Sequence, residues 1–196
     1  MATEKHALVA FGANLRFGNL SPDTTIIAAI AALGEAGVFV NQLSGLYQTP
    51  CFPAGTGPDY INAAASVTLR NEHSAAGILA VLHSVEAVFG RQRQQRWGMR
   101  TLDIDLLALD DLILPDLATH DHWRRLEADS QRTTAPDQLV LPHPRLQDRA
   151  FVLVPLADVA PDWRHPVLGQ TVLQMLAALP QSDRDAIVTL KPRESD

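Results

Sequence analysis

Short apolar runs with a two-residue period recur along the chain, and each predicts a β-strand because alternate side chains of a strand point to opposite faces. Turn residues bound these runs, such as the Gly-Ala-Asn turn at residues 12–14 and the proline- and glycine-rich loop at residues 49–58. Residues 112–114 follow the fourth run and are expected to be its hairpin partner. The predicted strands are residues 6–11, 38–47, 60–69, 101–109 and 186–190.

Other segments repeat their apolar positions with the period of a helix. Ser21 followed by Pro22 is typical of an N-cap with proline at the first helical position, and Ile26, Ile30 and Leu33 follow at helical spacing. Gly90 fits the position just after a helix C-cap. The predicted helices are residues 22–33, about 73–89, 151–156 and 172–179.

The order of these elements predicts an α+β fold. We expect a ferredoxin-like βαββαβ core with a mostly antiparallel sheet, helices packed on one face of it, and a C-terminal extension. A length of 196 residues suits a single domain, 1–196. Residues 115–138 are polar and charged, and we interpret them as an insertion because the following segments still need the same core. Within it, we expect Thr119 to cap a short helix that docks through Trp123 and Leu126.

The amino-acid composition excludes several classes of protein. Apolar residues at 46% and charged residues at 19% are ordinary for a globular enzyme. The net charge of -6 argues against a nucleic-acid partner. The single cysteine, Cys51, excludes an internal disulfide framework and favours a reducing compartment. Because no apolar run reaches the length of a signal or a membrane span, we expect a cytoplasmic protein with no membrane partner.

The strongest chemical signal lies in residues 91–107, RQRQQRWGMRTLDIDLL. Asp103 and Asp105 alternate with apolar residues, so a strand would place both carboxylates on one face, about 6.6 Å apart. Such like charges repel unless a cation compensates, and Mg²⁺ prefers carboxylate oxygens. The four arginines in residues 91–100 offer planar donors that match phosphate. The tract predicts a metal and phosphate site, with a solvated edge-strand face as the alternative.

Four segments together resemble a known family. They are AFGANL near the N-terminus, LYQTP followed by DYINAA, RWGMRTLDIDLL, and LPHPRLQDRAFVLVPL. Their order and spacing are similar to those of 6-hydroxymethyl-7,8-dihydropterin pyrophosphokinases, enzymes of folate biosynthesis, over nearly the whole chain except residues 115–138. The resemblance implies in-line transfer of pyrophosphate from ATP to 6-hydroxymethyl-7,8-dihydropterin, with AMP as the other product. ATP and the pterin would be its small-molecule partners.

The resemblance also implies roles for particular residues. Asp103 and Asp105 would hold two Mg²⁺ ions, Tyr60 and Phe151 would enclose the pterin ring, and Trp97 would close over the nucleotide. Taken alone, Tyr60 and Phe151 could be core aromatics, and Asn62 and His143 could be turn residues. The implied pterin site is Thr49, Pro50, Phe52, Tyr60, Asn62 and Phe151; the implied ATP site is Glu86, Arg91, Arg93, Trp97, Arg100, His143 and Arg149; and the implied catalytic residues are Arg91, Arg100, Asp103 and Asp105.

The sequence departs from the family pattern at four positions. Met99 and Cys51 stand where proline is usual, Ala13 where serine is usual, and His83 where glutamine is common. These departures affect the shape of loops, because proline restricts φ and methionine does not. They leave Asp103 and Asp105 unchanged.

Two other classes of function remain as alternatives. A nucleotidyltransferase would usually carry Gly-Ser before its acidic pair, where this chain has Gly98-Met99. A ferredoxin-like RNA-binding module would need a basic face with exposed aromatic residues, whereas aromatic residues make up only 6% here. We expect a monomer, with a weak dimer as the alternative. Because the insertion joins the strand of the two aspartates to the His143 segment, we expect it near the nucleotide.

Overall fold

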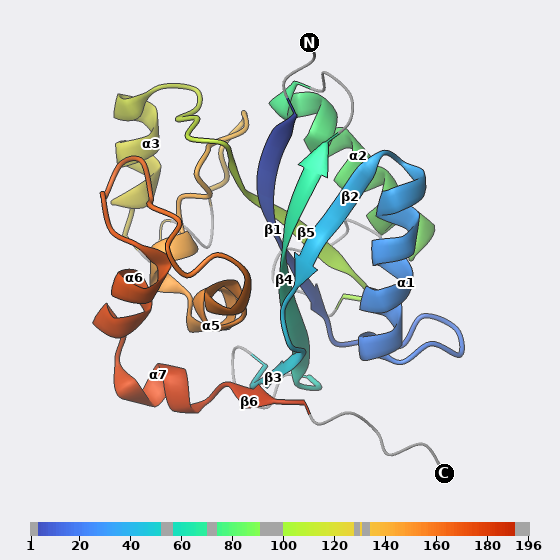
Figure 1. Ribbon diagram of the computed structural model, residues 1–196. Coiled ribbons are helices and arrows are strands. Elements are labelled where there is room, and N and C mark those ends of the chain that lie inside the picture. Colours follow the sequence, from blue (N-terminus) through green and yellow to red (C-terminus); the bar gives the residue numbers. More distant parts are fainter. Residues whose placement is uncertain are drawn as a thin grey trace.

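An antiparallel sheet forms the centre of the computed structural model, which describes residues 4–51, 57–69, 74–90, 100–127, 130 and 134–190 (Figure 1). Within these residues the sheet has six strands in the order β5-β1-β4-β3-β6, and β2 also pairs with β4. All its pairings are antiparallel. The strands are β1 (Lys5–Ala13), β2 (Val38–Leu43), β3 (Tyr47–Thr49), β4 (Tyr60–Leu69), β5 (Asp103–Leu109) and β6 (Val188–Thr189).

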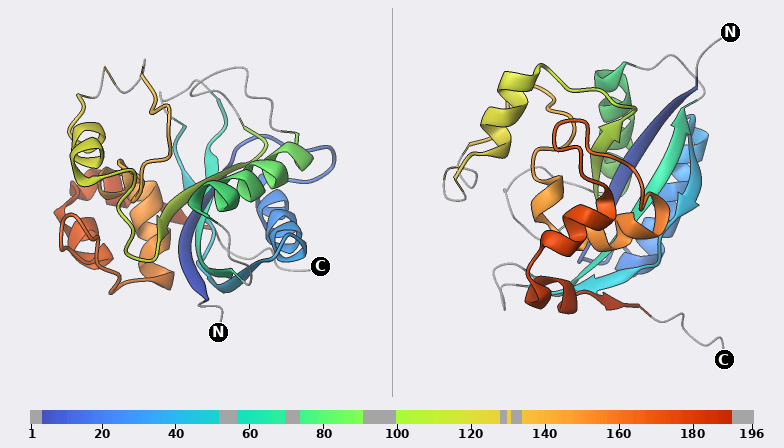
Figure 2. Two further views of the ribbon diagram at one scale, coloured as in Figure 1. Left: turned by 90° about the horizontal axis from the view of Figure 1, so that it is seen from above. Right: turned by 60° about the vertical axis from the view of Figure 1, so that its left-hand side comes forward.

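Helices cover both faces of this sheet, so the expectation of helices on one face is wrong. Figure 2 shows α1 and α2 on one side of the strands and the C-terminal helices on the other. The C-terminal extension takes the second face because Leu8, Ala10 and Leu107 point toward it and form a second apolar cluster. The helices are α1 (Pro22–Glu35), α2 (Ala75–Val88), α3 (Leu117–Arg124), η1 (Leu146–Asp148), α5 (Ala150–Val159), α6 (Val172–Ala178) and α7 (Gln181–Asp185).

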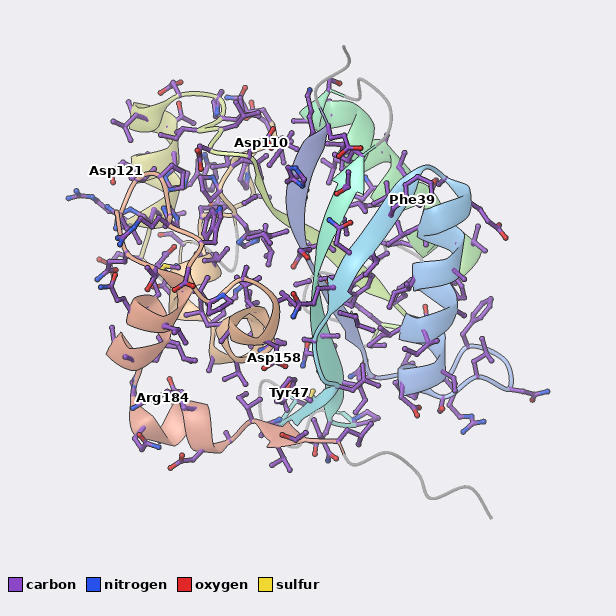
Figure 3. All side chains as sticks on the ribbon, viewed as in Figure 1. Phe39, Tyr47, Asp110, Asp121, Asp158 and Arg184 are labelled. Atoms are coloured by element: carbon purple, nitrogen blue, oxygen red, sulfur yellow. The ribbon has the colours of Figure 1, made fainter. Side chains whose placement is uncertain are left out.

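The predicted βαββαβ core is confirmed, but its second strand is broken in two. β2 ends at Leu43 and β3 begins at Tyr47, and both pair with β4. Asp158 of α5 contacts the chain at this break: its Oδ2 accepts hydrogen bonds from Gly45 N at 3.0 Å and from Tyr47 Oη at 2.8 Å. Figure 3 shows Tyr47 and Asp158 side by side, and this contact joins the C-terminal layer to the sheet.

Two local predictions are wrong, and a third is confirmed. Leu114 pairs with Leu141 rather than with β5, exchanging backbone hydrogen bonds of 2.9 and 3.1 Å. The cap of α3 is Asp116, whose Oδ1 accepts Thr119 N at 2.9 Å, so Thr119 is the third helical residue. Ser21 occupies the N-cap of α1 as predicted, but its hydroxyl bonds Thr24 Oγ1 at 2.8 Å instead of a backbone amide.

Two further predictions concern the insertion and the end of the chain. Trp123 and Leu126 are half-buried, and the fully buried residue of α3 is His120. The last strand, β6, is shorter than predicted, and the preceding helix α7 was not predicted. Among the described residues, each helix is too short or too polar to cross a bilayer.

Gly90 ends α2 in a conformation that only glycine adopts easily. Its φ is +78°, and a Cβ atom there would lie 3.0 Å from Phe17 Cε2, an aromatic ring that packs on Phe89. We therefore expect Gly90→Ala to lower the free energy of unfolding by about 1–2 kcal/mol in urea denaturation. Gly34→Ala in α1 is the matched control: its Cβ has open space, and the change should raise stability by up to about 1 kcal/mol. Equal stabilities of the two variants would contradict this explanation.

Candidate active site

Asp103 and Asp105 lie at the start of β5 and share one face of the sheet, as the strand period predicts. Asp103 pairs in register with Gly12 of β1, and Asp105 pairs with Ala10, which belongs to the apolar cluster under α5. Both aspartates are half-buried, while Ile104 between them is buried on the opposite face. The two carboxylates therefore face the C-terminal layer from the rim of the sheet.

Glu86 fixes the strand between these two aspartates from behind. Its side chain comes from α2, is only 1% exposed, and accepts Ile104 N at 2.8 Å through Oε1. A hydrogen bond to a buried backbone amide satisfies a donor that would be costly to leave without a partner away from water. Glu86 therefore positions β5, and its implied contact with ATP stays a prediction.

Arg100 reaches Asp103 from the residues just before β5. Its Nη1 forms an ion pair with Asp103 Oδ2. The backbone of Arg100 is anchored to the turn after β1, because its N donates to Asn14 Oδ1 at 2.8 Å and its carbonyl accepts Asn14 N at 3.0 Å. The backbone contacts with Asn14 thus hold Arg100 where its guanidinium reaches the Asp103 carboxylate.

Asn14 is a residue of the site that the sequence reasoning did not single out. It is 3% exposed, and its Nδ2 also donates to Pro58 O at 3.1 Å. One side chain therefore joins the turn after β1, the loop before β4 and Arg100. The available signal was its place in the AFGANL motif, directly after a buried strand.

His143 and Arg149 approach the aspartates from the other side. His143 N donates to Leu107 O of β5 at 2.8 Å, which ties its segment to the aspartate strand. Arg149 is the N-cap residue of α5, and the charges of Asp105 and Asp103 act on it. Desolvation lowers the pKa of Arg149, but an arginine this close to two carboxylates remains a cation at neutral pH.

The His143 imidazole is neutral and its tautomer is defined. Its Nδ1 accepts Arg145 N at 3.1 Å, so the proton is on Nε2. Desolvation, and then the charge of Arg149, lower the pKa of His143 to about 3. Nε2–H is therefore a neutral hydrogen-bond donor at physiological pH.

The residues implied for the pterin site gather beside the same rim. Asn62 donates to Thr49 Oγ1 at 2.7 Å, and both side chains are buried. Tyr60 pairs with Thr49 across β3 and β4 and is half-buried; burial raises its pKa, and the nearby charge of Arg100 opposes that rise. Gly12 permits this packing, because a Cβ there would lie 3.3 Å from Asn62 Oδ1.

Phe151 lies in the first turn of α5 and is 39% exposed, so it is not a core aromatic. The Arg149 guanidinium carbon lies 5.6 Å from the centre of the Phe151 ring, a distance at which a cation interacts with an aromatic face. The exposed ring is thus attached to the side of the site that carries Arg149. Pro50 is exposed at the end of β3.

Part of the predicted site lies outside the described residues. These positions are Phe52, Arg91, Arg93 and Trp97, together with the unusual Met99. The other three departures are described: Ala13 and Cys51 are buried, and His83 is half-buried on α2.

The described part of the site brings carboxylate oxygens close to cationic and neutral hydrogen-bond donors. In the parts of the chain that the structure describes, Asp103 and Asp105 are not joined by a third histidine, cysteine or carboxylate that would complete a protein-only metal cage. Two carboxylates with cationic and neutral donors around them suit Mg²⁺, which takes one or two carboxylates and completes its shell with water and phosphate. Fold and site together define an α+β protein with a candidate phosphoryl-transfer centre.

Comparison with known proteins identifies the family. The sequence model of 7,8-dihydro-6-hydroxymethylpterin-pyrophosphokinase (HPPK) matches residues 8–161, and the chain belongs to this family. A 2-amino-4-hydroxy-6-hydroxymethyldihydropteridine pyrophosphokinase from Synechocystis is 39% identical over 161 residues, covering 81% of this chain and 71% of the relative. The enzyme of that name from Pseudomonas aeruginosa is 36% identical over 176 residues, covering 88% and 90%.

Solved structures support the same fold. An HPPK-DHPS crystal structure from Plasmodium falciparum has a TM-score of 0.64 at 15% identity and covers 89% of this chain. A second HPPK-DHPS structure, in complex with substrates, has a TM-score of 0.63 at 14% identity. This chain spans less than half the length of those chains, 44% and 43%. The α+β fold with its mostly antiparallel sheet is therefore confirmed.

The neutral state of His143 can be tested by NMR of its imidazole. We expect the ring in the folded protein to keep the Nε2–H tautomer from pH 8 down to pH 5, whereas the same ring in urea-unfolded chain should titrate near about 6.5. Because the pKa of His143 is lower in the folded than in the unfolded state, its neutral ring contributes fully to the free energy of unfolding above about pH 6.5. This contribution falls as the pH drops toward about 3. A folded-state midpoint near 6.5 would refute the prediction.

Proposed function

We propose that the protein transfers pyrophosphate from ATP to 6-hydroxymethyl-7,8-dihydropterin and releases AMP and the pterin diphosphate, a step of folate biosynthesis. The observation that carries this proposal is the grouping of Asp103, Asp105 and Arg100 at one rim of the sheet in a chain of this family. The names of the similar enzymes from Synechocystis and Pseudomonas aeruginosa, which specify a pyrophosphokinase of this pterin alcohol, support it.

Asp103 and Asp105 would hold two Mg²⁺ ions between them. When bound, such ions neutralise the triphosphate charge and orient it for displacement. The donor set supports this assignment, because hard carboxylate oxygens on a rigid strand leave open positions for phosphate oxygens.

Positively charged side chains of the protein would neutralise the rest of the triphosphate charge. Arg100 forms an ion pair with Asp103, and its planar guanidinium also suits a phosphate of ATP bound beside that carboxylate. Arg149 lies at the N-terminus of α5, where a positive side chain and the helix dipole both favour an anion. His143 would add a neutral donor through Nε2–H. Arg91, Arg93 and Trp97 are proposed to close over the nucleotide, and Glu86 to complete its site.

Positioning rather than proton transfer would account for most of the rate, because phosphoryl-type transfer requires little covalent chemistry from the protein. The hydroxymethyl oxygen would attack the β-phosphorus, and the bond from that phosphorus to the oxygen bridging to the α-phosphate would break. We assign Tyr60 and Phe151 to the faces of the pterin ring, and Asn62, Thr49, Pro50 and Phe52 to its edge. Aromatic faces and a few fixed polar groups suit a flat heteroaromatic ligand.

We also propose a monomer in the cytoplasm. The net charge of -6 and the single, buried cysteine support a dispersed protein in a reducing compartment. A mass of about 21.3 kDa in sedimentation equilibrium would agree with this proposal, and twice that mass would favour the dimer.

The reaction class can be decided by its nucleotide product. Protein is incubated with Mg²⁺, ATP and the pterin alcohol, and the nucleotides are separated by chromatography. AMP with an equal amount of pterin diphosphate is the expected result. ADP would indicate an ordinary kinase, and released pyrophosphate would indicate a nucleotidyltransferase; either would overturn the proposal.

Asp105→Asn tests the metal assignment. Removing one charge of the pair should lower kcat by on the order of 100-fold or more, while thermal stability without Mg²⁺ stays equal or rises because the two carboxylates repel. Asp111→Asn, which removes an exposed carboxylate from the turn after β5, is the matched control and should keep full activity. Full activity of Asp105→Asn would refute the metal assignment.

A further inference from the structure

One buried histidine anchors the insertion to the rest of the protein. His120 lies in α3, is 0% exposed, and its Nε2 lies 3.0 Å from Pro142 O. Because a carbonyl oxygen only accepts, the proton is on Nε2 and His120 is the donor. The other nitrogen, Nδ1, has no hydrogen-bond partner among the described residues. Burying a polar ring with one nitrogen that lacks a partner costs free energy. The hydrogen bond to Pro142 O is the polar contact that offsets part of this cost.

A second buried histidine supports the first from the C-terminal extension. His165 is also 0% exposed, and its ring centre lies 5.7 Å from that of His120 in an edge-to-face arrangement. Its Nδ1 accepts the amides of Val167 and Leu168 at 3.2 and 3.3 Å, and the ring centre of Trp163 lies 5.8 Å from that of His165. Burial lowers the pKa of both histidines, that of His165 to about 4, so neither ring carries a charge at neutral pH.

The carbonyl that His120 holds belongs to the residue directly before His143. Proline has no N–H, so the carbonyl is the only backbone hydrogen-bonding group of Pro142, and His120 occupies it. The same peptide unit continues into His143 N, which donates to Leu107 O at 2.8 Å. Both polar atoms of this planar unit are therefore held, one by the insertion and one by the aspartate strand.

The insertion and the His143 segment are also joined one step earlier. Leu114, just before the insertion, exchanges two backbone hydrogen bonds with Leu141. Residues 141, 142 and 143 thus bond in turn to Leu114 just before the insertion, to α3 and to β5. Together these contacts set the position of the His143 Cα atom and the plane that precedes it.

We infer that His120 is a positioning residue of the nucleotide side of the site: from the insertion it orients the Pro142–His143 peptide so that the His143 imidazole faces bound ATP. The inference rests on the proposed function. It makes the insertion part of the ATP site, although no side chain of α3 need touch the nucleotide. The substrate concerned is ATP and not the pterin, whose implied residues, among those that the structure describes, lie on β3 or directly after it, on β4 and on α5.

The test compares two substitutions of His120. His120→Phe keeps a buried ring and removes the donor, whereas His120→Gln keeps an N–H donor that can reach Pro142 O. We expect His120→Phe to raise KM for ATP about 10-fold, the effect of losing roughly one hydrogen bond, and to leave KM for the pterin within about twofold. His120→Gln should recover to within about threefold of wild type. His122→Ala, an exposed position of the same helix, is the control and should match wild type.

A second measurement does not depend on turnover. Amide hydrogen exchange at His143 should accelerate in His120→Phe and return toward wild type in His120→Gln. If wild type makes no AMP, the proposed function fails, and this measurement still decides whether His120 holds the segment. Unchanged KM for ATP with unchanged exchange would overturn the inference, as would an equal rise of both KM values that His120→Gln does not reverse.

Wild-type protein provides the remaining test should His120→Phe fail to fold. Addition of Mg²⁺ with a non-hydrolysable ATP analogue should shift the ring NMR signals of His120 and leave those of His122 in place. The pterin alcohol alone should leave both unchanged. A pterin-induced shift of His120 equal to that caused by the ATP analogue would contradict the assignment to the nucleotide side.

Discussion

The architecture depends on one constraint, which is that two like charges must be held on one short strand. Asp103 and Asp105 cannot move apart, because the strand period and the pairing with Gly12 and Ala10 fix their spacing. Their repulsion is opposed by Arg100 on one side and by the positive field of Arg149 on the other. Neighbouring like charges cost free energy, and such costly arrangements are found most often at functional sites. The repelling pair of carboxylates therefore lies where the candidate active site lies.

The two helical layers contact β5 from opposite faces of the sheet. The layer of α1 and α2 holds it from behind through Glu86 and the larger apolar cluster. The C-terminal layer supplies His143, Arg149 and Phe151 from the front, and Asp158 attaches this layer to β3. Because the site lies between two layers, both layers must be held in fixed positions relative to β5. The polar contacts on β5 and on the segments beside it fix these positions.

The sequence predicted those features that depend on neighbouring residues alone. The period of residues 101–109 placed both aspartates on one face, and glycine conformational freedom marked the end of α2 at Gly90. Contacts between distant segments were not predictable: Asp158 of α5 accepts Gly45 N at the break between β2 and β3, and Glu86 of α2 accepts Ile104 N of β5. Thr119 was predicted to cap α3, but the helix begins earlier and Asp116 is its cap, a boundary that the residue types alone did not locate.

The outer edge of β5 has a further consequence. β5 is the terminal strand of the sheet on that side, yet Ile104 N is taken by Glu86 and Leu107 O by His143 N. These bonds occupy backbone groups that a neighbouring molecule would need in order to add a strand to the sheet. The contacts that shape the nucleotide side therefore also act as protection against edge-to-edge aggregation. Substitutions that loosen them should be judged by colloidal behaviour at high concentration as well as by kinetics.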